Sequence, residues 1–166
     1  MTFTLAIDPG TTHSGWVSYD SGRVADFGKW ENEDMLERVR EDTGDYIAIE
    51  MIASYGMPVG AEVFETCVWI GRFIQAWSDR RGWADTEPII VYRKDVKMHL
   101  CGTTKAKDGN IRQAIIDIYG GKDKAIGKKA SPGPLYGIAG DVWAAVGVAL
   151  AAEARMSANE LGDARV

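Results

Sequence analysis

The amino-acid sequence predicts a single α/β domain built on a mixed five-stranded sheet. Near the N-terminus, three short segments with strand-like patterning follow one another through turn residues, which is typical of an antiparallel meander. Two later apolar segments alternate with stretches of helical periodicity, which is typical of parallel strands joined by crossover helices. With 166 residues, the chain is long enough for one domain with a substantial core.

The strands are predicted from short apolar or alternating segments that end at turn residues. Pro9 and Gly10 end the first strand, and Ser21-Gly22 marks a hairpin turn between the second and the third. The fourth, YIAIE, is almost continuously apolar, as is usual for a strand buried on both faces. We expect strands at residues 3–8, 15–20, 23–31, 46–50 and 88–93.

The helices are predicted from apolar residues spaced three and four apart and from terminal signals. Asn32 is a suitable N-cap for the first helix, and Gly44 a suitable end. Residues 1–156 would form the domain and residues 157–166 a polar tail, with a loop at 122–138. We expect helices at residues 32–44, 61–82, 94–100, 106–121 and 139–156.

Composition argues against several classes of protein. No apolar run approaches the roughly 20 residues that span a bilayer, and the N-terminus has no signal-peptide pattern, so we expect a cytoplasmic protein with no membrane partner. Cys67 and Cys101 stand in dissimilar contexts, which disfavours a zinc site or a disulfide scaffold.

The charge is unevenly distributed along the chain. The net charge of −5 argues against nucleic acid as a partner, and acidic residues are frequent between 20 and 45. Basic residues dominate at 92–112 and 122–129, so an acidic protein could still present a basic face. Ordinary solvated surface charge is the alternative for either segment.

Three carboxylates stand at the ends of predicted elements. Asp8 ends the first strand, Glu50 ends the fourth, and Asp141 opens the last helix. If the two strands are parallel neighbours, their acids emerge at one edge, and the helix could bring Asp141 to them. Oxygen-only ligands suit Mg²⁺ or Mn²⁺, and two such ions about 4 Å apart can clamp a scissile phosphate. Incidental strand-end acids and a helix N-cap are the alternatives.

Four motifs, in chain order, resemble those of the RuvC-type Holliday-junction resolvases of the RNase H-like superfamily. They are AIDPGTTHSGW, YIAIE, LCGTTKAKDGNIRQAIIDIYG and YGIAGDVWAAVGVALA. The resemblance covers nearly the whole chain and implies an RNase H-like fold. It also implies a phage-like member that cleaves Holliday junctions or other branched DNA with two Mg²⁺ or Mn²⁺ ions. Its location would be the cytoplasm of a bacterium or of a phage-infected cell.

The resemblance assigns the catalytic carboxylates to Asp8, Glu50 and Asp141. It implies a fourth ligand three residues before the last of these, where this chain has Ile138, so another group or water would have to fill that place. A functional lysine is implied just before the fourth predicted helix, and Lys107 is the best match. A solvent-exposed loop lysine is the alternative reading of this residue.

The resemblance further implies a homodimer and a DNA-binding surface. The helix at 61–82 carries large apolar side chains on more than one face, so one face could meet a second copy, although deep burial is an alternative. Tyr55 is the nearest match to an aromatic residue that wedges into the junction centre, and a core tyrosine is the alternative. The candidate phosphate contacts are Lys94, Lys97, Lys105, Arg112, Lys128 and Lys129, with Lys122 and Lys124 in the same basic strip.

Other functions remain open from the sequence. IDPGTTHSG also resembles the phosphate loop of actin-like and sugar-kinase ATPases, but those proteins need two such domains and this chain is too short. A YqgF-like RNA-processing nuclease, a nuclease for flaps or forks, and a catalytically inactive branched-DNA-binding protein would all share the motifs.

Overall fold

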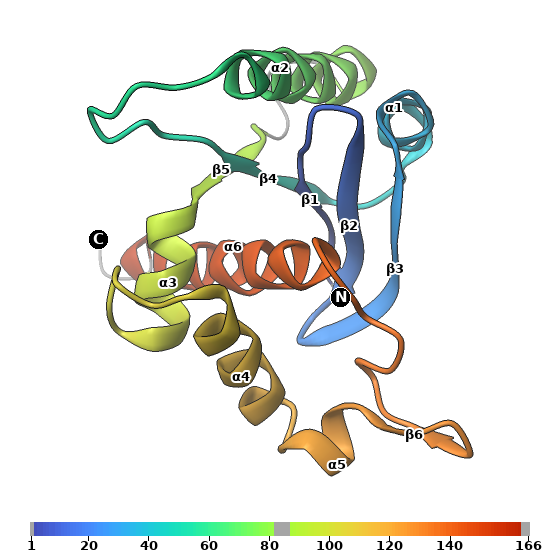
Figure 1. Ribbon diagram of the computed structural model, residues 1–166. Helices are drawn as coiled ribbons and strands as arrows, with labels where there is room; N and C mark the ends of the chain where they lie inside the picture. The colour runs from blue at the N-terminus through green and yellow to red at the C-terminus, as the bar shows by residue number, and fades with distance from the viewer. Residues whose placement is uncertain (1, 82–86, 164–166) are drawn as a thin grey trace.

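The computed structural model describes residues 2–81 and 87–163 and contains a mixed five-stranded sheet in the order β3-β2-β1-β4-β5 (Figure 1). The first three strands pair antiparallel, whereas β4 runs parallel to β1 and β5 parallel to β4. This arrangement confirms the predicted fold class. The strands are β1 (Phe3–Asp8), β2 (His13–Asp20), β3 (Arg23–Glu31), β4 (Tyr46–Met51) and β5 (Ile89–Tyr92).

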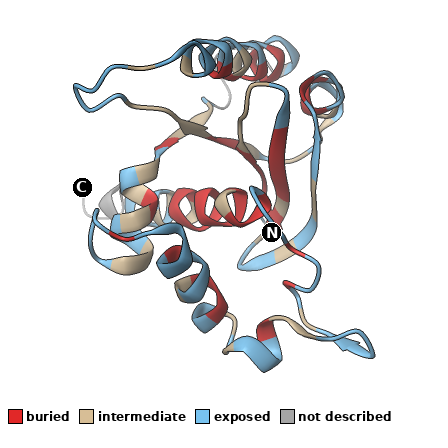
Figure 2. Cartoon of the chain, in the orientation of Figure 1, coloured by how far each residue is buried: buried red, intermediate tan, exposed pale blue. Residues whose placement is uncertain are grey.

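Helices cover both faces of this sheet (Figure 1). On one side lie α1 and α2, and on the other α6 crosses the sheet with α3 and α4 packed beside it. The middle of α6 is almost wholly buried, as its apolar sequence predicts (Figure 2). The helices are α1 (Asn32–Glu41), α2 (Ala61–Arg81), α3 (Arg93–Cys101), α4 (Asp108–Ile118), α5 (Lys122–Ala125) and α6 (Val142–Asp163). Within the described ranges, no helix is long and apolar enough to cross a membrane.

Strand alternation assigns each central residue to one of the two layers. Leu5 and Ile7 of β1 pack in the cluster with α1 and α2, whereas Ala6 packs in the cluster with α6. In β4, Ile49 and Ala48 divide in the same way. The next residue of each series, Asp8 in β1 and Glu50 in β4, therefore belongs to the α6 face of the sheet.

Several predicted boundaries are wrong. The first helix ends at Glu41 and not at Gly44, because Asp42 already has an extended backbone conformation. The segment 122–138 is not simply a loop, because it contains α5 and a small hairpin of β6 (Gly127–Lys128) and β7 (Ser131–Pro132). The last helix does not end near Met156 but continues to Asp163, since no glycine or proline interrupts residues 157–161. Residues 164–166 of the predicted tail lie outside the described residues.

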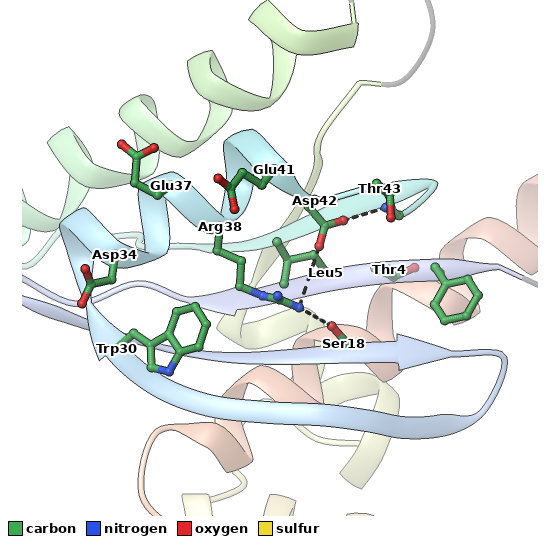
Figure 3. A pocket seen from close by; sticks show the side chains of 12 residues that line it. Thr4, Leu5, Ser18, Trp30, Asp34, Glu37, Arg38, Glu41, Asp42 and Thr43 are labelled. Atoms are coloured by element: carbon green, nitrogen blue, oxygen red, sulfur yellow. Dashed lines mark hydrogen bonds and ion pairs between the residues drawn. The ribbon is translucent and has the colours of Figure 1, made fainter.

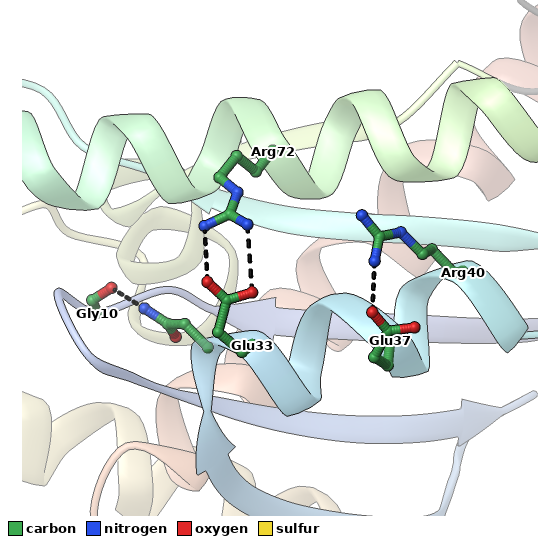
Figure 4. Close-up of polar contacts among 6 residues, drawn as sticks. Gly10, Glu33, Glu37, Arg40 and Arg72 are labelled. Atoms are coloured by element: carbon green, nitrogen blue, oxygen red, sulfur yellow. Dashed lines mark hydrogen bonds and ion pairs between the residues drawn. The ribbon is translucent and has the colours of Figure 1, made fainter.

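Asn32 is not the N-cap of α1, a place that Glu31 takes. Instead, its buried side chain accepts a hydrogen bond from the Ser14 hydroxyl at 2.6 Å and donates one to the Gly10 carbonyl at 2.9 Å. Its backbone N–H donates to the Thr12 carbonyl at 2.8 Å. The start of α1 thus fastens the turn that follows Asp8. Farther along, Glu33 of α1 forms a two-contact ion pair with Arg72 of α2 (Figure 4).

We expect Asn32→Ala to lower the free energy of unfolding by about 1–3 kcal/mol, because it leaves the buried Ser14 hydroxyl and the Gly10 carbonyl without their partner. Chemical denaturation measures the change. Glu41→Ala, at the exposed end of the same helix, is the control and should shift stability by no more than about 0.5 kcal/mol. Equal stabilities for Asn32→Ala and the wild type would contradict the structural role of this side chain.

Candidate active site

Asp8 and Glu50 lie side by side at the carboxyl ends of parallel strands. Ile7 is opposite Ile49 in the register of β1 and β4, so the two acids follow at the same level of the sheet. Only 12% of the Glu50 side chain is exposed. The Asp8 carboxyl, when protonated, donates a hydrogen bond to the Glu50 carboxylate. The predicted meeting of these two acids at one sheet edge therefore agrees with the structure.

The environment of the pair opposes two negative charges. Burial, followed by the charges of Glu50 and Asp141, raises the pKa of Asp8 to about 8 against the lowering effect of Arg93. Burial also raises the pKa of Glu50, which Arg93 counteracts. Arg93 Nη1 lies 3.8 Å from Glu50 Oε2, and both of these atoms are buried without a hydrogen-bond partner. The pair is thus short of positive charge and of donors.

Asp141 reaches the same region from the residue before α6. Its backbone lies directly on Gly15 of β2, where an added Cβ would stand 2.8 Å from the Asp141 carbonyl carbon and oxygen. Gly15 is opposite Asp8 in the β1–β2 register. Position 15 therefore has no room for a side chain, because α6 begins against the strand next to Asp8. A glycine inside a strand pattern is the sequence signal for such a close approach.

The Asp141 carboxylate is paired with Lys29 of β3. Lys29 Nζ lies 2.6 Å from Asp141 Oδ2, and half of each side chain is exposed. Lys29 is opposite Gly15 in the β2–β3 register, so Lys29, Gly15 and Asp8 form a row across three strands. No sequence motif points to Lys29. The only sequence sign of its position is weak: Lys29 is two residues after Phe27 in β3, and Phe27 packs against the α6 cluster, so both side chains are on that face of the strand.

One pocket of about 170 Å³ is lined by all three predicted carboxylates. Asp108, the first residue of α4, also lines it and forms an ion pair with Arg93. Both residues were absent from the predicted site, because their approach depends on how α3 and α4 pack. Ile138 is buried in the apolar core and contributes no donor.

The carboxylate oxygens of the pocket are suitable ligands for a divalent cation, but they are not grouped around one point. Several carboxylates share the pocket, and Glu50 Oε2 lacks a partner, which suits an oxygen-binding ion such as Mg²⁺. Among the residues that the structure describes, however, no three His, Cys, Asp or Glu side chains are grouped closely enough to hold a metal. The Asp141 side chain, held by Lys29, would have to turn toward the other two acids.

The predicted basic residues differ in their distance from this pocket. Lys97 of α3 is close enough to lower the pKa of Glu50, and Arg112 of α4 stacks over Trp143, which lines the pocket. Lys107 is exposed at the start of α4 and does not line it. The remaining ones are exposed: Lys94 of α3, which lies near the Tyr92 ring, Lys105, and the β6–β7 residues Lys128 and Lys129.

Tyr55 is 59% exposed, so the alternative of a core tyrosine is wrong. It lies in the loop between β4 and α2 and has a positive φ of 50°, a backbone conformation that non-glycine residues rarely adopt. On α2, Phe64 and Val68 are each 63% exposed, whereas Phe73 and Trp77 are buried against the sheet. The helix therefore has one covered apolar face and one that is open to solvent.

A larger cavity, of about 560 Å³, is lined by none of the three residues Asp8, Glu50 and Asp141 (Figure 3). It is formed by the start of β1, the β2–β3 pair and α1, and Arg38 is its central polar group. Arg38 donates to the Ser18 hydroxyl at 2.6 Å and stacks over the Trp16 ring at 4.1 Å. Ser18 and Trp16 thus hold this guanidinium in place, although its buried Nε has no hydrogen-bond partner.

Comparisons with known proteins give a likeness of fold. No protein-family model matches the chain, and no curated protein does. The structure of Thermus thermophilus RuvC matches with a TM-score of 0.64 at 17% identity, over 94% of this chain and 97% of that one. T. thermophilus RuvC in complex with a Holliday junction substrate matches with a TM-score of 0.67 at 18% identity, over 95% and 97%. The chain thus has the RNase H-like fold seen in RuvC.

We expect the free energy of unfolding of the metal-free protein to fall as the pH rises from about 4 to about 8. The unfolded chain releases the Asp8 proton near pH 3.8 and the native state near pH 8, so the native state binds one proton more between them. One such proton gives a slope of up to about 1.4 kcal/mol per pH unit. Urea unfolding in EDTA at several pH values measures it.

Asp8→Asn cannot ionise at this position and should lose that slope. Asp34→Asn, an exposed change in α1, is the control and should keep it. Parallel stability curves for Asp8→Asn and the wild type would show that Asp8 ionises normally in the folded chain.

Proposed function

We propose that the protein is a metal-dependent endonuclease that hydrolyses phosphodiester bonds in Holliday junctions or other branched DNA. The observation that carries this proposal is the buried Asp8–Glu50 pair, with Asp141 lining the same pocket, at the strand ends of an RNase H-like sheet. Two further facts support it: the four motifs resemble those of the resolvases, and the fold matches that of RuvC bound to a junction. The proposed location is the cytoplasm of a bacterium or phage-infected cell.

In this proposal, Asp8, Glu50 and Asp141 hold Mg²⁺ or Mn²⁺. The ion, when bound, would activate water and offset the charge of the scissile phosphate. Asp8 must lose its proton to become a ligand, so protons and metal ions compete for this carboxyl. Arg93 remains beside Glu50 and limits the excess negative charge of the pocket.

The DNA would lie over the open side of the pocket. Lys97 and Arg112 stand nearest to the carboxylates and would contact phosphates there, with Lys94, Lys105 and Lys107 farther out. The β6–β7 hairpin, with Lys128 and Lys129, projects from the body of the domain and could grip another duplex arm (Figure 1). These contacts would position the DNA without reading its sequence.

A four-way junction requires two symmetric cuts, which a two-fold homodimer supplies. The open apolar face of α2, with Phe64 and Val68, is the surface that we propose for the second copy. Tyr55 is exposed near the start of the same helix and could stack on an unpaired base at the junction centre.

A catalytically inactive branched-DNA-binding protein is the second candidate. It is favoured by the ion pair between Lys29 and Asp141, which keeps one predicted ligand away from the other two. The two candidates differ in the outcome of a single assay: only the first predicts cleavage when Mg²⁺ or Mn²⁺ is added.

We expect Asp8→Asn and Glu50→Gln each to reduce Mg²⁺-dependent cleavage by on the order of a thousandfold while leaving DNA binding within a few-fold of wild type. A panel of a four-way junction, a fork, a flap and an RNA hairpin measures cleavage and identifies the substrate. Asp34→Asn is the matched control. Unchanged cleavage by Asp8→Asn would refute the mechanism, and wild-type inactivity with both metals would favour the binding-only candidate.

We expect Lys128→Ala/Lys129→Ala to weaken junction binding and to make it less sensitive to salt. Each lost phosphate contact should reduce the slope of log K against log salt by about 0.9. Fluorescence anisotropy over a range of salt concentrations measures both effects. Arg23→Ala, at the exposed β2–β3 turn, is the control and should change neither. A double variant with the wild-type slope would place this hairpin outside the DNA interface.

A further inference from the structure

We infer that Lys29 supplies one of the positive charges of the active site from within the chain, so that the site takes one divalent ion rather than two. This inference rests on the proposed function and revises two parts of it: the expectation of two ions, and the role of Asp141 as a metal ligand, because Lys29 holds its carboxylate. It follows from a contrast between the two halves of the pocket, the buried half at Asp8 and Glu50 and the exposed half at Asp141.

The buried half lacks a cation at bonding distance. Arg93 is the nearest described cationic group, and its Nη1 stops 3.8 Å short of Glu50 Oε2. Both of these atoms remain buried and unpartnered. Buried carboxylates without a close counter-charge are costly, and a bound ion would remove that cost. One divalent cation is therefore accounted for by Asp8 and Glu50.

The exposed half already has its counter-charge. The Lys29 ammonium lies 2.6 Å from Asp141 Oδ2, well within hydrogen-bond distance. The strand register holds Lys29 in place: Lys29 is opposite Gly15, and Gly15 carries the Asp141 backbone on its open side. This lysine thus belongs to the same row of the sheet as Asp8, although it comes from a different strand.

Apart from Asp141, the exposed half has no free donor to offer a second ion. The residue three positions before Asp141 is Ile138, which is 7% exposed and packs in the apolar core. Asp108 lines the pocket, but it is engaged by Arg93 on the Glu50 side. With one carboxylate and one ammonium, the Asp141 side is neutral before any metal arrives.

An ammonium in this position could serve the reaction directly. Lys29 has three N–H donors and uses one on Asp141, so the others are free to meet a phosphate oxygen from the solvent side. It would offset charge on the phosphate group as a second ion would, without competing for Mg²⁺. An exposed ion pair is otherwise worth little to stability, so a merely structural role would leave few traces on removal.

The test is to count Mn²⁺ ions per chain by electron paramagnetic resonance, and to measure junction cleavage over a range of Mn²⁺ concentrations. We expect one ion per wild-type chain and two per Lys29→Met chain, because the substitution frees Asp141 for a second ion. Cleavage by Lys29→Met should fall by on the order of tenfold at limiting Mn²⁺ and recover at high Mn²⁺. Lys29→Arg, which keeps the charge, should retain the count of one.

The control is Arg23→Met, an exposed cation on the same strand as Lys29 but outside the pocket, which should change neither the count nor the metal dependence. Two ions per wild-type chain, or the same count in Lys29→Met and wild type, would overturn the inference. So would a Lys29→Met variant that cleaves better than wild type at limiting metal, since Lys29 would then only block the site.

Failure of the proposed function has a different signature. If no variant cleaves any DNA in the panel but the ion count still rises from one to two in Lys29→Met, the nuclease proposal fails and the role of Lys29 as a built-in cation stands. If the wild-type chain cleaves junctions and the counts are equal, the nuclease stands and this inference fails. If no chain binds Mn²⁺, both fail.

Discussion

The contact between two buried carboxyl groups, Asp8 and Glu50, is the constraint on which the rest of the candidate site depends. Parallel pairing of β1 and β4 forces the two side chains together, and the surrounding apolar layers keep water from screening them. A folded chain can tolerate such a pair only by retaining a proton or by gaining a cation. The high pKa of Asp8 represents the first solution, and the proposed metal ion the second.

The surrounding residues are arranged as a response to that constraint. Arg93 approaches from the end of β5, Asp108 balances Arg93, and Lys29 balances Asp141 on the opposite side. The acids and bases thus alternate around the pocket instead of forming a compact acidic cluster. This alternation explains why the donor chemistry fits a metal although no three acids are yet grouped around one point.

Much of the fold, and the core of the candidate site, could be predicted from the sequence because both depend on local patterns. Strand alternation and turn residues predict β1 and β4, and parallel pairing then brings Asp8 to Glu50. The contributions of Lys29, Gly15 and Arg93 depend on register between strands, which no local pattern specifies. The end of α6 lies beyond the predicted one because the polar residues 157–161 contain no glycine or proline and continue the helix. Asn32 fastens the loop after β1 and does not cap α1, a difference that residue type alone cannot predict because an asparagine side chain suits both roles.

The hydrogen bonds of Asn32 also affect how the two sides of the pocket are held. They attach the turn beyond Asp8 to the layer of α1. Asp141 precedes α6, which packs in the layer on the other side of the sheet. The two sides of the pocket are therefore attached to different layers of the fold. Because the Asp141 backbone rests on the bare backbone of Gly15, opposite Asp8, the width of the pocket is set by the absence of a side chain at position 15.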